Sequence, residues 1–315
     1  MNLVPMATIK ASFLIKVVIA STLVVFLLSC NKDLPVEEVA GTPGVTPSPS
    51  PSGPDTGISY QGPALCDFNP DGSELIRAGW KLEFEDNFDG DLAKWDSWTG
   101  GGNDRELQFY QPANALTANG VLQISAKKEN VTGATSPSNP ALKNYKYTSA
   151  RIESKAKFSA NSGTPKVRIA ARIKLPGGFG MVPVFLSYGT PWPTQGHINM
   201  LVADGQAPKR YITNYFYGSS PNINTVNNSF GYITSDADLT TCYHVYEMEW
   251  SQDALTFFLD GKLVEKKTSG GHIPDLFGKS QRLSLYLSVQ TDFIYRTKIE
   301  PRTMTVDWIK VFTSK

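Results

Sequence analysis

The sequence predicts an all-β fold, a two-sheet antiparallel sandwich or jelly roll. Apolar and polar residues alternate along 167–174 and 283–290, which turns one set of side chains toward a core and the other toward water or a cleft. The pair Asp260-Gly261 separates two such runs and predicts a hairpin with a tight turn. No long helical pattern follows the first thirty residues, so short strands between turns account for the rest.

Residues 1–29 are predicted to be the signal peptide of a lipoprotein. Lys10 and Lys16 precede an apolar run at 17–28, which is shorter than the roughly 20 residues of a membrane-spanning helix. Residues 27–30, Leu-Leu-Ser-Cys, resemble a bacterial lipobox, in which the cysteine is acylated. Cys30 is therefore the expected lipidation site, and the alternative is an ordinary signal peptide with a chance cysteine.

The residues after the cysteine predict where the protein is anchored. Asn31 follows Cys30 in place of the aspartate that often marks retention in the inner membrane. Charged residues at 32–38 resemble the tether of surface-exposed lipoproteins of the Bacteroidota. We therefore expect an outer-membrane lipoprotein, held at the cell surface through its lipid anchor.

A linker and one β domain make up the remainder. The segment 30–74 contains the anchor cysteine and a stretch rich in Pro, Ser and Thr, in which 46–54 cannot bury apolar surface and should stay extended. Residues 75–315 form a segment of ordinary length for a single β sandwich. The stalk would hold this domain away from the lipid surface.

The cysteines and the net charge limit the kinds of function. Cys66 and Cys242 remain for the exported domain, where they either form one disulfide or stay as two buried thiols. No Cys and His spacing suggests a zinc site. The net charge of +1 gives no electrostatic reason to expect a nucleic-acid partner.

Six segments of the predicted β domain carry motifs that occur together in one known family. They lie at 80–90, 103–110, 147–152, 171–176, 244–250 and 306–312, and include Asp-Asn-Phe-Asp-Gly at 86–90 and Glu-Leu-Gln-Phe-Tyr at 106–110. In this order they resemble glycoside hydrolase family 16, the laminarinase-like group. The resemblance implies a concanavalin-like jelly roll, a two-sheet β-sandwich with a concave cleft that holds a glycan chain.

The strand that carries the acids of this family is degenerate here. The family motif is Gly-Glu-Ile-Asp-Ile-Met-Glu, with or without a bulge residue, and residues 196–202 read Gly-His-Ile-Asn-Met-Leu-Val. His197 stands where the nucleophile belongs and Asn199 where the supporting aspartate belongs. A bulge that re-aims the last side chain would place Val202 at the acid/base position, and a regular strand would place Leu201 there. The resemblance therefore implies that no catalytic carboxylate remains.

The same cleft could still bind a sugar, because binding needs polar groups and an aromatic platform rather than acids. If the family geometry holds, the following residues line it: Asn103, Glu106, Trp192, His197, Asn199 and Tyr215. Glu106 could instead pair with Arg105 or Arg151, and Trp192 could be a packing residue. Residues 182–186 lack two tryptophans of the family, so the glycan could be a β-1,3-glucan or another β-glycan. No cofactor is expected apart from a structural calcium at Asp307, whose alternative is a solvent-facing aspartate.

Three functions follow from these observations. The leading hypothesis is a non-catalytic, surface-anchored lipoprotein that captures polysaccharide and works beside a glycan-transport complex. The second is an active β-glycan hydrolase with relocated acids, for which Glu106 or Asp104 are the candidates. The third is a structural or docking subunit of an envelope complex. Whether the chain is an enzyme is thus left open by the sequence.

Overall fold

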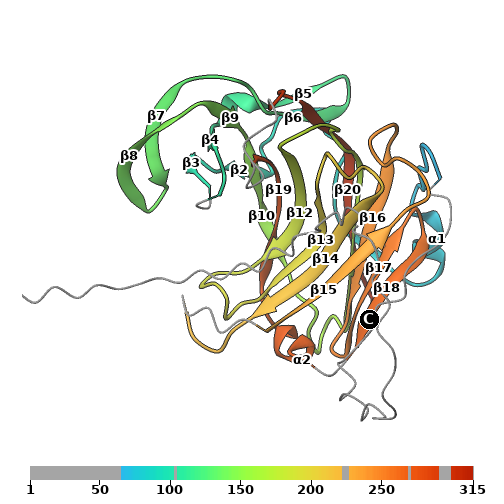
Figure 1. Ribbon diagram of the computed structural model, residues 1–315. Helices are drawn as coiled ribbons and strands as arrows, with labels where there is room; N and C mark the ends of the chain where they lie inside the picture. The colour runs from blue at the N-terminus through green and yellow to red at the C-terminus, as the bar shows by residue number, and fades with distance from the viewer. Residues whose placement is uncertain (1–64, 103–104, 222–226, 269–270, 291–298, 315) are drawn as a thin grey trace, which may run out of the picture. The chain divides into compact units, whose positions relative to one another are not determined.

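Two antiparallel sheets enclose one hydrophobic core in the computed structural model of this chain (Figure 1). The structure describes residues 65–102, 105–221, 227–268, 271–290 and 299–314. All of them belong to the unit formed by 51–315. The predicted signal peptide, Cys30 and most of the predicted linker lie outside the described residues.

The larger sheet has eight strands. Its order places strands far apart in sequence side by side, because the C-terminal strand β20 pairs with β1, β6 and β11. In sheet order the strands are β18 Lys262–Thr268, β17 Ala254–Leu259, β16 His244–Trp250, β11 Lys166–Lys174, β20 Thr303–Ser314, β6 Val121–Ser125 and β5 Ala115–Ala118, with β1 Lys81–Asp86 beside β20.

The second sheet has seven strands and contains residues 197–203 on its strand β13. In sheet order they are β15 Asn227–Thr234, β14 Arg210–Tyr217, β13 His197–Ala203, β12 Met181–Tyr188, β19 Gln281–Val289, β10 Arg151–Phe158 and β2 Trp95–Ser97. All its strand pairs are antiparallel, as predicted.

Small elements extend the second sheet beyond β2. A three-stranded sheet consists of β3 Gly100–Gly101, β4 Gln108–Tyr110 and β9 Tyr147–Ser149, in which β4 and β9 are parallel. A separate hairpin consists of β7 Val131–Ser136 and β8 Asn139–Tyr145. The helical elements are short: α1 Ser73–Arg77, the 3-10 turn Pro112–Asn114 and α2 Ile273–Leu276.

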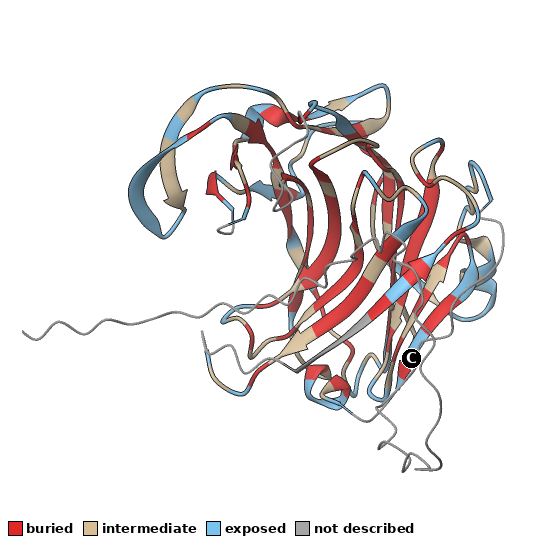
Figure 2. Cartoon of the chain, in the orientation of Figure 1, coloured by how far each residue is buried: buried red, intermediate tan, exposed pale blue. Residues whose placement is uncertain are grey.

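The predicted period-two alternation is confirmed in both sheets. The odd-numbered apolar residues of 167–173 and 283–289 are all fully buried in the core between the sheets. Figure 2 shows the central strands mainly in the colour of buried residues, whereas β8 is mainly exposed. The predicted tight turn is also present, since Asp260 and Gly261 both have positive φ, of 50° and 74°, between β17 and β18.

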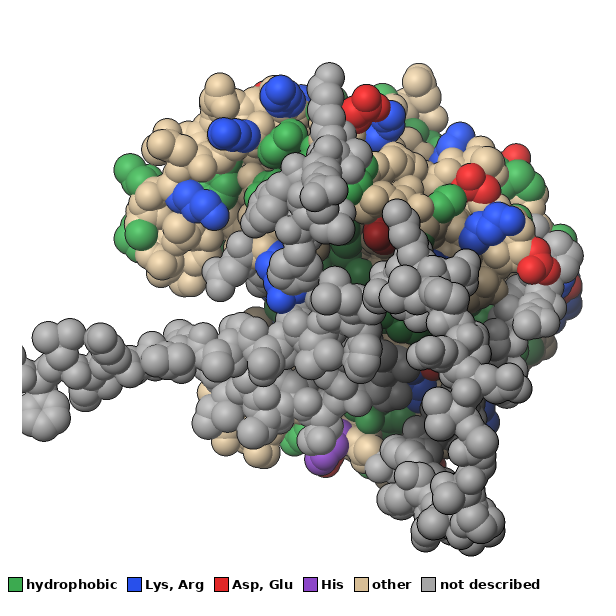
Figure 3. All heavy atoms as spheres, viewed as in Figure 1, with side chains coloured by type: hydrophobic (Ala, Val, Ile, Leu, Met, Phe, Trp, Pro, Cys, Tyr) green, Lys and Arg blue, Asp and Glu red, His purple; other side chains and the backbone are tan. Residues whose placement is uncertain are grey.

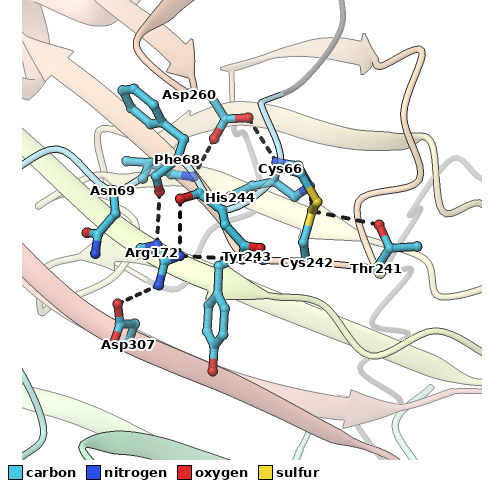
Figure 4. Close-up of polar contacts among 12 residues, drawn as sticks. Cys66, Phe68, Asn69, Arg172, Thr241, Cys242, Tyr243, His244, Asp260 and Asp307 are labelled. Carbon is cyan, nitrogen blue, oxygen red and sulfur yellow. Dashed lines mark hydrogen bonds and ion pairs between the residues drawn. A yellow bond between two sulfur atoms is a disulfide. The ribbon is translucent and has the colours of Figure 1, made fainter.

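Residues 65–72 form a strap on the side of the eight-stranded sheet that faces away from the core (Figure 4). A disulfide joins Cys66 of the strap to Cys242, just before β16, so the two cysteines are bridged rather than free. His244 lies beside this bridge. Its Nδ1 is 2.9 Å from Oδ2 of Asp260, and its Nε2 is 3.4 Å from Sγ of Cys242.

Arg172 hydrogen-bonds both to the strap and to Asp307, the aspartate expected to be a calcium ligand (Figure 4). Its Nε donates to the carbonyl oxygen of Phe68 at 2.9 Å, and its Nη1 donates to Oδ2 of Asp307 at 2.6 Å. The guanidinium thus supplies the positive charge that a calcium ion would bring. Within the described ranges, no group of three or more His, Cys, Asp or Glu side chains could hold a metal ion.

On the face shown in Figure 3, the Lys and Arg side chains of the described residues lie apart and do not merge into one broad patch. Among the residues that the structure describes, no helix is long and apolar enough to cross a membrane.

Candidate functional site

A bulge in β13 decides which of its side chains share a face. The pairing of β13 with β12 and with β14 shifts register after Asn199. Met200 and Leu201 both pack in the core, although they are consecutive residues. His197, Asn199 and Val202 therefore point to the opposite side of the sheet, which we call the site face. The alternative that the sequence left open between Leu201 and Val202 is thus resolved in favour of Val202.

Neutral side chains on this strand form a hydrogen-bonded chain. Nε2 of His197 lies 2.9 Å from Oδ1 of Asn199, and Nδ2 of Asn199 donates to Oδ1 of Asn214 on β14. Because an amide oxygen can only accept, Nε2 of His197 carries the proton in this arrangement and Nδ1 is left as an acceptor. The ring also meets Phe216 edge-on, with 5.1 Å between ring centroids.

The imidazole is held in its uncharged form. Burial lowers the pKa of His197 to about 4, the hydrogen bond with Asn199 opposes this shift, and the nearby Arg151 adds to it. His197 is therefore neutral at pH 7 and adds no charge to the site face.

Because of the register in which the strands pair, the side chains of the site face form rows that run across the sheet. Residues directly paired across neighbouring strands are brought within side-chain contact distance. The three rows are Arg151, Tyr286, Val184 and Val202; Glu153, Ser284, Leu186 and Asn199; and Arg282, Tyr188 and His197. The face thus combines charged, aromatic and apolar groups beside His197, Asn199 and Val202.

A guanidinium surrounded by aromatic rings is the main feature next to β13. The guanidinium carbon of Arg151 is 4.3 Å from the ring centroid of Trp98, 5.4 Å from that of Tyr188 and 5.3 Å from that of Tyr286. These distances are typical of cation–π contacts. Trp98 lies in the short connection between β2 and β3, and all four side chains are half-buried.

Glu153 balances the charge of this arginine. Its Oε1 accepts hydrogen bonds from Nε of Arg151 at 2.9 Å and from the hydroxyl of Tyr188 at 2.7 Å, and its Oε2 is 3.4 Å from Nη1 of Arg282. Burial opposes the charged form of Arg151, but Glu153 and the nearby tyrosines together outweigh it and raise the pKa of the guanidinium. Burial raises the pKa of Tyr188 to about 12. The cluster is therefore an ion pair with a neutral phenol at neutral pH.

Glu106 lies near the edge of the same face. Its Oε2 accepts hydrogen bonds from Nε2 of Gln108 at 2.8 Å and from the hydroxyl of Tyr110 at 3.0 Å. Tyr110 in turn meets Tyr286 edge-on, with 6.0 Å between centroids. This buried carboxylate therefore connects to the aromatic cluster through one phenol.

Other predicted site residues lie elsewhere. Tyr215, expected in the cleft, packs in the core instead, and its hydroxyl accepts from the backbone N–H of His272 at 3.2 Å. The physical reason is strand alternation, because Tyr215 pairs with the core residue Ile198 while its neighbour Phe216 pairs with His197. Trp192 is half-buried in the connection between β12 and β13. Asn103 lies outside the described residues, as does Asp104.

Reasoning from the sequence missed the arginine and aromatic cluster. A usable signal was present for Tyr286, since Arg282, Ser284 and Tyr286 alternate with buried leucines and had to face away from the core. Trp98 gave no such signal because it follows β2 outside any regular strand.

The chain is similar to known proteins in both sequence and fold. Residues 112–310 match the family model "Glycosyl hydrolases family 16". Glucan endo-1,3-beta-glucosidase A1 of Niallia circulans is 27% identical over 268 residues, covering 75% of this chain but 38% of that protein. Glucan endo-1,3-beta-glucosidase of Cryptopygus antarcticus is 26% identical over 262 residues, covering 76% of this chain and 94% of that protein. Among solved structures, the endo-beta-1,3-glucanase from Pyrococcus furiosus has a TM-score of 0.61 at 26% identity, covering 74% of this chain and 94% of that chain.

Proposed function

The chain belongs to glycosyl hydrolases family 16, and from this premise we propose that its domain binds a β-glycan without hydrolysing it. The observation that carries the proposal is the chemistry of the three residues of β13 on the site face. They are His197, Asn199 and Val202, and none of them is a carboxylate. The fold of the family is retained, while the groups that the reaction needs are replaced.

The chemistry of glycoside hydrolysis explains why these replacements matter. A retaining enzyme needs an ionised carboxylate and a protonated carboxyl about 5 Å apart. The low pKa of His197 keeps its imidazole neutral at pH 7, and Asn199 cannot ionise. Val202 has no proton to give to a leaving oxygen. Removing even one group of such a set typically costs several orders of magnitude in rate.

The site face retains what sugar binding requires. Trp98, Tyr188 and Tyr286 offer aromatic rings on which a sugar ring can stack. The hydroxyl of Ser284, in the row between Glu153 and Asn199, is buried and has no hydrogen-bond partner among the described residues. A buried water molecule would satisfy it. The aromatic and polar groups thus favour a neutral polyhydroxylated ligand.

The class of glycan is suggested by the relatives. Two of them are named glucan endo-1,3-beta-glucosidases, so a β-1,3-glucan is the first ligand to test. The Val and Leu side chains at 182–186, in place of family tryptophans, make another β-glycan the alternative within the same proposal.

The N-terminal residues complete the proposal. We infer that 1–29 direct export, that Cys30 carries the lipid, and that 30–74 hold the domain at the surface of the outer membrane. A binding domain placed there would capture polysaccharide for a glycan-transport complex. Labelling of the protein with a radioactive fatty acid, and its loss on Cys30→Ser, would test the anchor. Protease treatment of intact cells would then distinguish the outer from the inner face of the membrane.

Affinity electrophoresis of the purified protein in gels with laminarin, lichenan or agarose tests the binding function. We expect retardation by at least one polysaccharide and a roughly tenfold weaker apparent affinity for Trp98→Ala. Tyr243→Ala is the matched control, because its ring stacks on Arg172 at 4.6 Å on the opposite sheet. Migration unaffected by all three glycans, together with a stable co-purifying protein, would favour a docking subunit instead.

A second candidate function is hydrolysis with relocated acids, and the positions of two carboxylates favour it. Glu153 lies on the site face itself, and Glu106 reaches the same face through Tyr110. Incubation with laminarin, lichenan and agarose followed by a reducing-end assay tests this candidate. Release of reducing ends by the wild type that is lost in Glu106→Gln would establish hydrolysis and overturn the non-catalytic proposal.

A further inference from the structure

The hairpin β7–β8 borders a hollow that lies next to the edge of the site face. The hollow has a volume of about 350 Å³ and is lined by Glu106, Ser136, Asn139, Lys143 and Tyr145, among others. This volume falls within the range of about 300–1,000 Å³ typical of small-molecule sites. The hairpin therefore forms one wall of the hollow, and the other wall contains the carboxylate of Glu106, at the edge of the site face.

The wall formed by the hairpin is packed closely against its neighbours. A Cβ atom on Gly101 would collide with the hydroxyl of Tyr145, and one on Gly133 would collide with the ring of Phe109. A Cβ on Gly102 would likewise collide with Oε2 of Glu106. Glycine at these positions is what allows β3, β4 and the hairpin to approach so closely. The hollow is thus bounded by packed elements rather than by a loosely attached hairpin.

The position of the hollow continues the site face. The seven-stranded sheet ends at β2, and Trp98 connects this strand to β3, against which β7 packs. Nε1 of Trp98 donates to the carbonyl oxygen of Gly101 at 3.4 Å, beside the hollow. A glycan chain that stacks on Trp98 would therefore meet the hollow next.

The lining groups carry both signs of charge. Glu106 is 5% exposed and can only accept hydrogen bonds as a carboxylate. Lys143 has no ion-pair partner within the described ranges, and its Nζ lies 5.4 Å from the ring centroid of Tyr145. An anionic ligand would be repelled by Glu106 and a cationic one by Lys143, whereas sugar hydroxyls can donate to the first and accept from the second.

We propose that this hollow is an additional carbohydrate subsite, which binds one neutral sugar residue beyond the site face through Glu106, Asn139 and Lys143. This subsite rests on the proposed glycan-binding function, and it is the place where a longer glycan would gain binding affinity. Asn139 supports it, because it lines the hollow and its Oδ1 already accepts from the backbone N–H of Ala141 at 3.1 Å, so the amide nitrogen is left as the donor.

Calorimetric titration of the purified protein with laminaritriose and laminariheptaose tests the subsite. We expect the heptaose to bind at least tenfold more tightly than the triose. Lys143→Ala and Asn139→Ala should weaken heptaose binding about five- to tenfold, because each removes one hydrogen-bonding group, and should leave triose binding unchanged. Lys146→Ala is the matched control, since it removes the same charge one residue beyond β8 and should leave both affinities unchanged.

The outcomes separate the subsite from the function on which it rests. Equal affinity for triose and heptaose, or equal effects of Lys143→Ala on both, would overturn the subsite and leave the glycan-binding function intact. If neither oligosaccharide binds, the subsite and the proposed β-1,3-glucan binding fail together. Because both substituted residues are exposed, the variants should fold, and a circular dichroism spectrum identical to that of the wild type would verify this.

Discussion

The hydroxyl of Tyr188 donates a 2.7 Å hydrogen bond to Glu153, so a phenol and a carboxylate from two non-neighbouring strands meet on the site face. Glu153 also bonds to Arg151 and is 3.4 Å from Arg282. One carboxylate thus holds together side chains from β10, β12 and β19. The cluster stands on the same face as His197, Asn199 and Val202 of β13.

Glu153→Gln should destabilise the domain, because it leaves the guanidinium of Arg151 without its counter-charge. Removing one partner of a buried pair costs about 3–5 kcal/mol, and the 19% exposure of the Arg151 side chain reduces our expectation to roughly 2–4 kcal/mol. Urea unfolding of the purified protein measures the change. Glu83→Gln, which breaks an exposed pair with Lys81, should cost less than about 1 kcal/mol. Similar losses in both variants would contradict the assigned role of Glu153.

The stability of the domain should depend on pH through His197. Its pKa is about 4 in the folded protein against 6.5 for the ordinary value, so between these values the unfolded state binds a proton that the folded state does not. Stability from this residue is therefore present above pH 6.5 and is lost as the pH falls toward 4. His197→Gln, which keeps an N–H donor for Asn199, removes this contribution.

Urea unfolding at pH 7 and pH 4.5 measures that contribution. Both proteins also lose stability from other groups, so the informative quantity is the difference between their losses. We expect the wild type to lose on the order of 2 kcal/mol more than His197→Gln between the two pH values. Identical losses would show that the imidazole is not held neutral.

The disulfide should contribute substantially to stability, because it closes a loop with a sequence separation of 176 residues. Replacing Cys66 and Cys242 together by serine should lower the free energy of unfolding by roughly 2–5 kcal/mol. A dithiol reductant should lower the stability of the wild type to that of the double variant and leave the variant unchanged. A reductant effect of equal size in the double variant would exclude the bridge as its cause.

Calcium should have little effect on this domain. Asp307 is already bonded to Arg172 at 2.6 Å, so a calcium ion would have to compete with a guanidinium. We expect the melting temperature to be the same in calcium and in EDTA, and Asp307→Asn to lower it because Arg172 loses a charge partner. A calcium-dependent rise in melting temperature that disappears in Asp307→Asn would instead support the calcium site expected from the sequence.

The sequence did not always reveal which side of a strand faces the core. In β19 the alternation of leucines with polar residues was regular, and all the leucines are buried as predicted. In β14 aromatic residues occur at both parities, with Tyr211, Tyr215 and Tyr217 on one and Phe216 on the other. Periodicity alone could not say which set faced the core, and the prediction for Tyr215 was wrong for that reason.

The bulge in β13 shows a different limit. The residues at 196–202 contain no carboxylate, and this holds in any register. The choice between Leu201 and Val202, however, depends on an extra residue that opposes no partner, which becomes visible only in the pairing with β12 and β14.

The sequence by itself determined which chemical groups are available: the alternating strands, the turn at Asp260, and the imidazole, amide and alkyl group of His197, Asn199 and Val202. Tertiary structure alone decided which groups meet. The rings of three residues from separate segments of the chain, Trp98, Tyr188 and Tyr286, converge on the guanidinium of Arg151, which comes from a fourth segment. Local periodicity sets the side on which a side chain lies, but its neighbours on that side are set by long-range strand pairing, which depends on how the whole core packs.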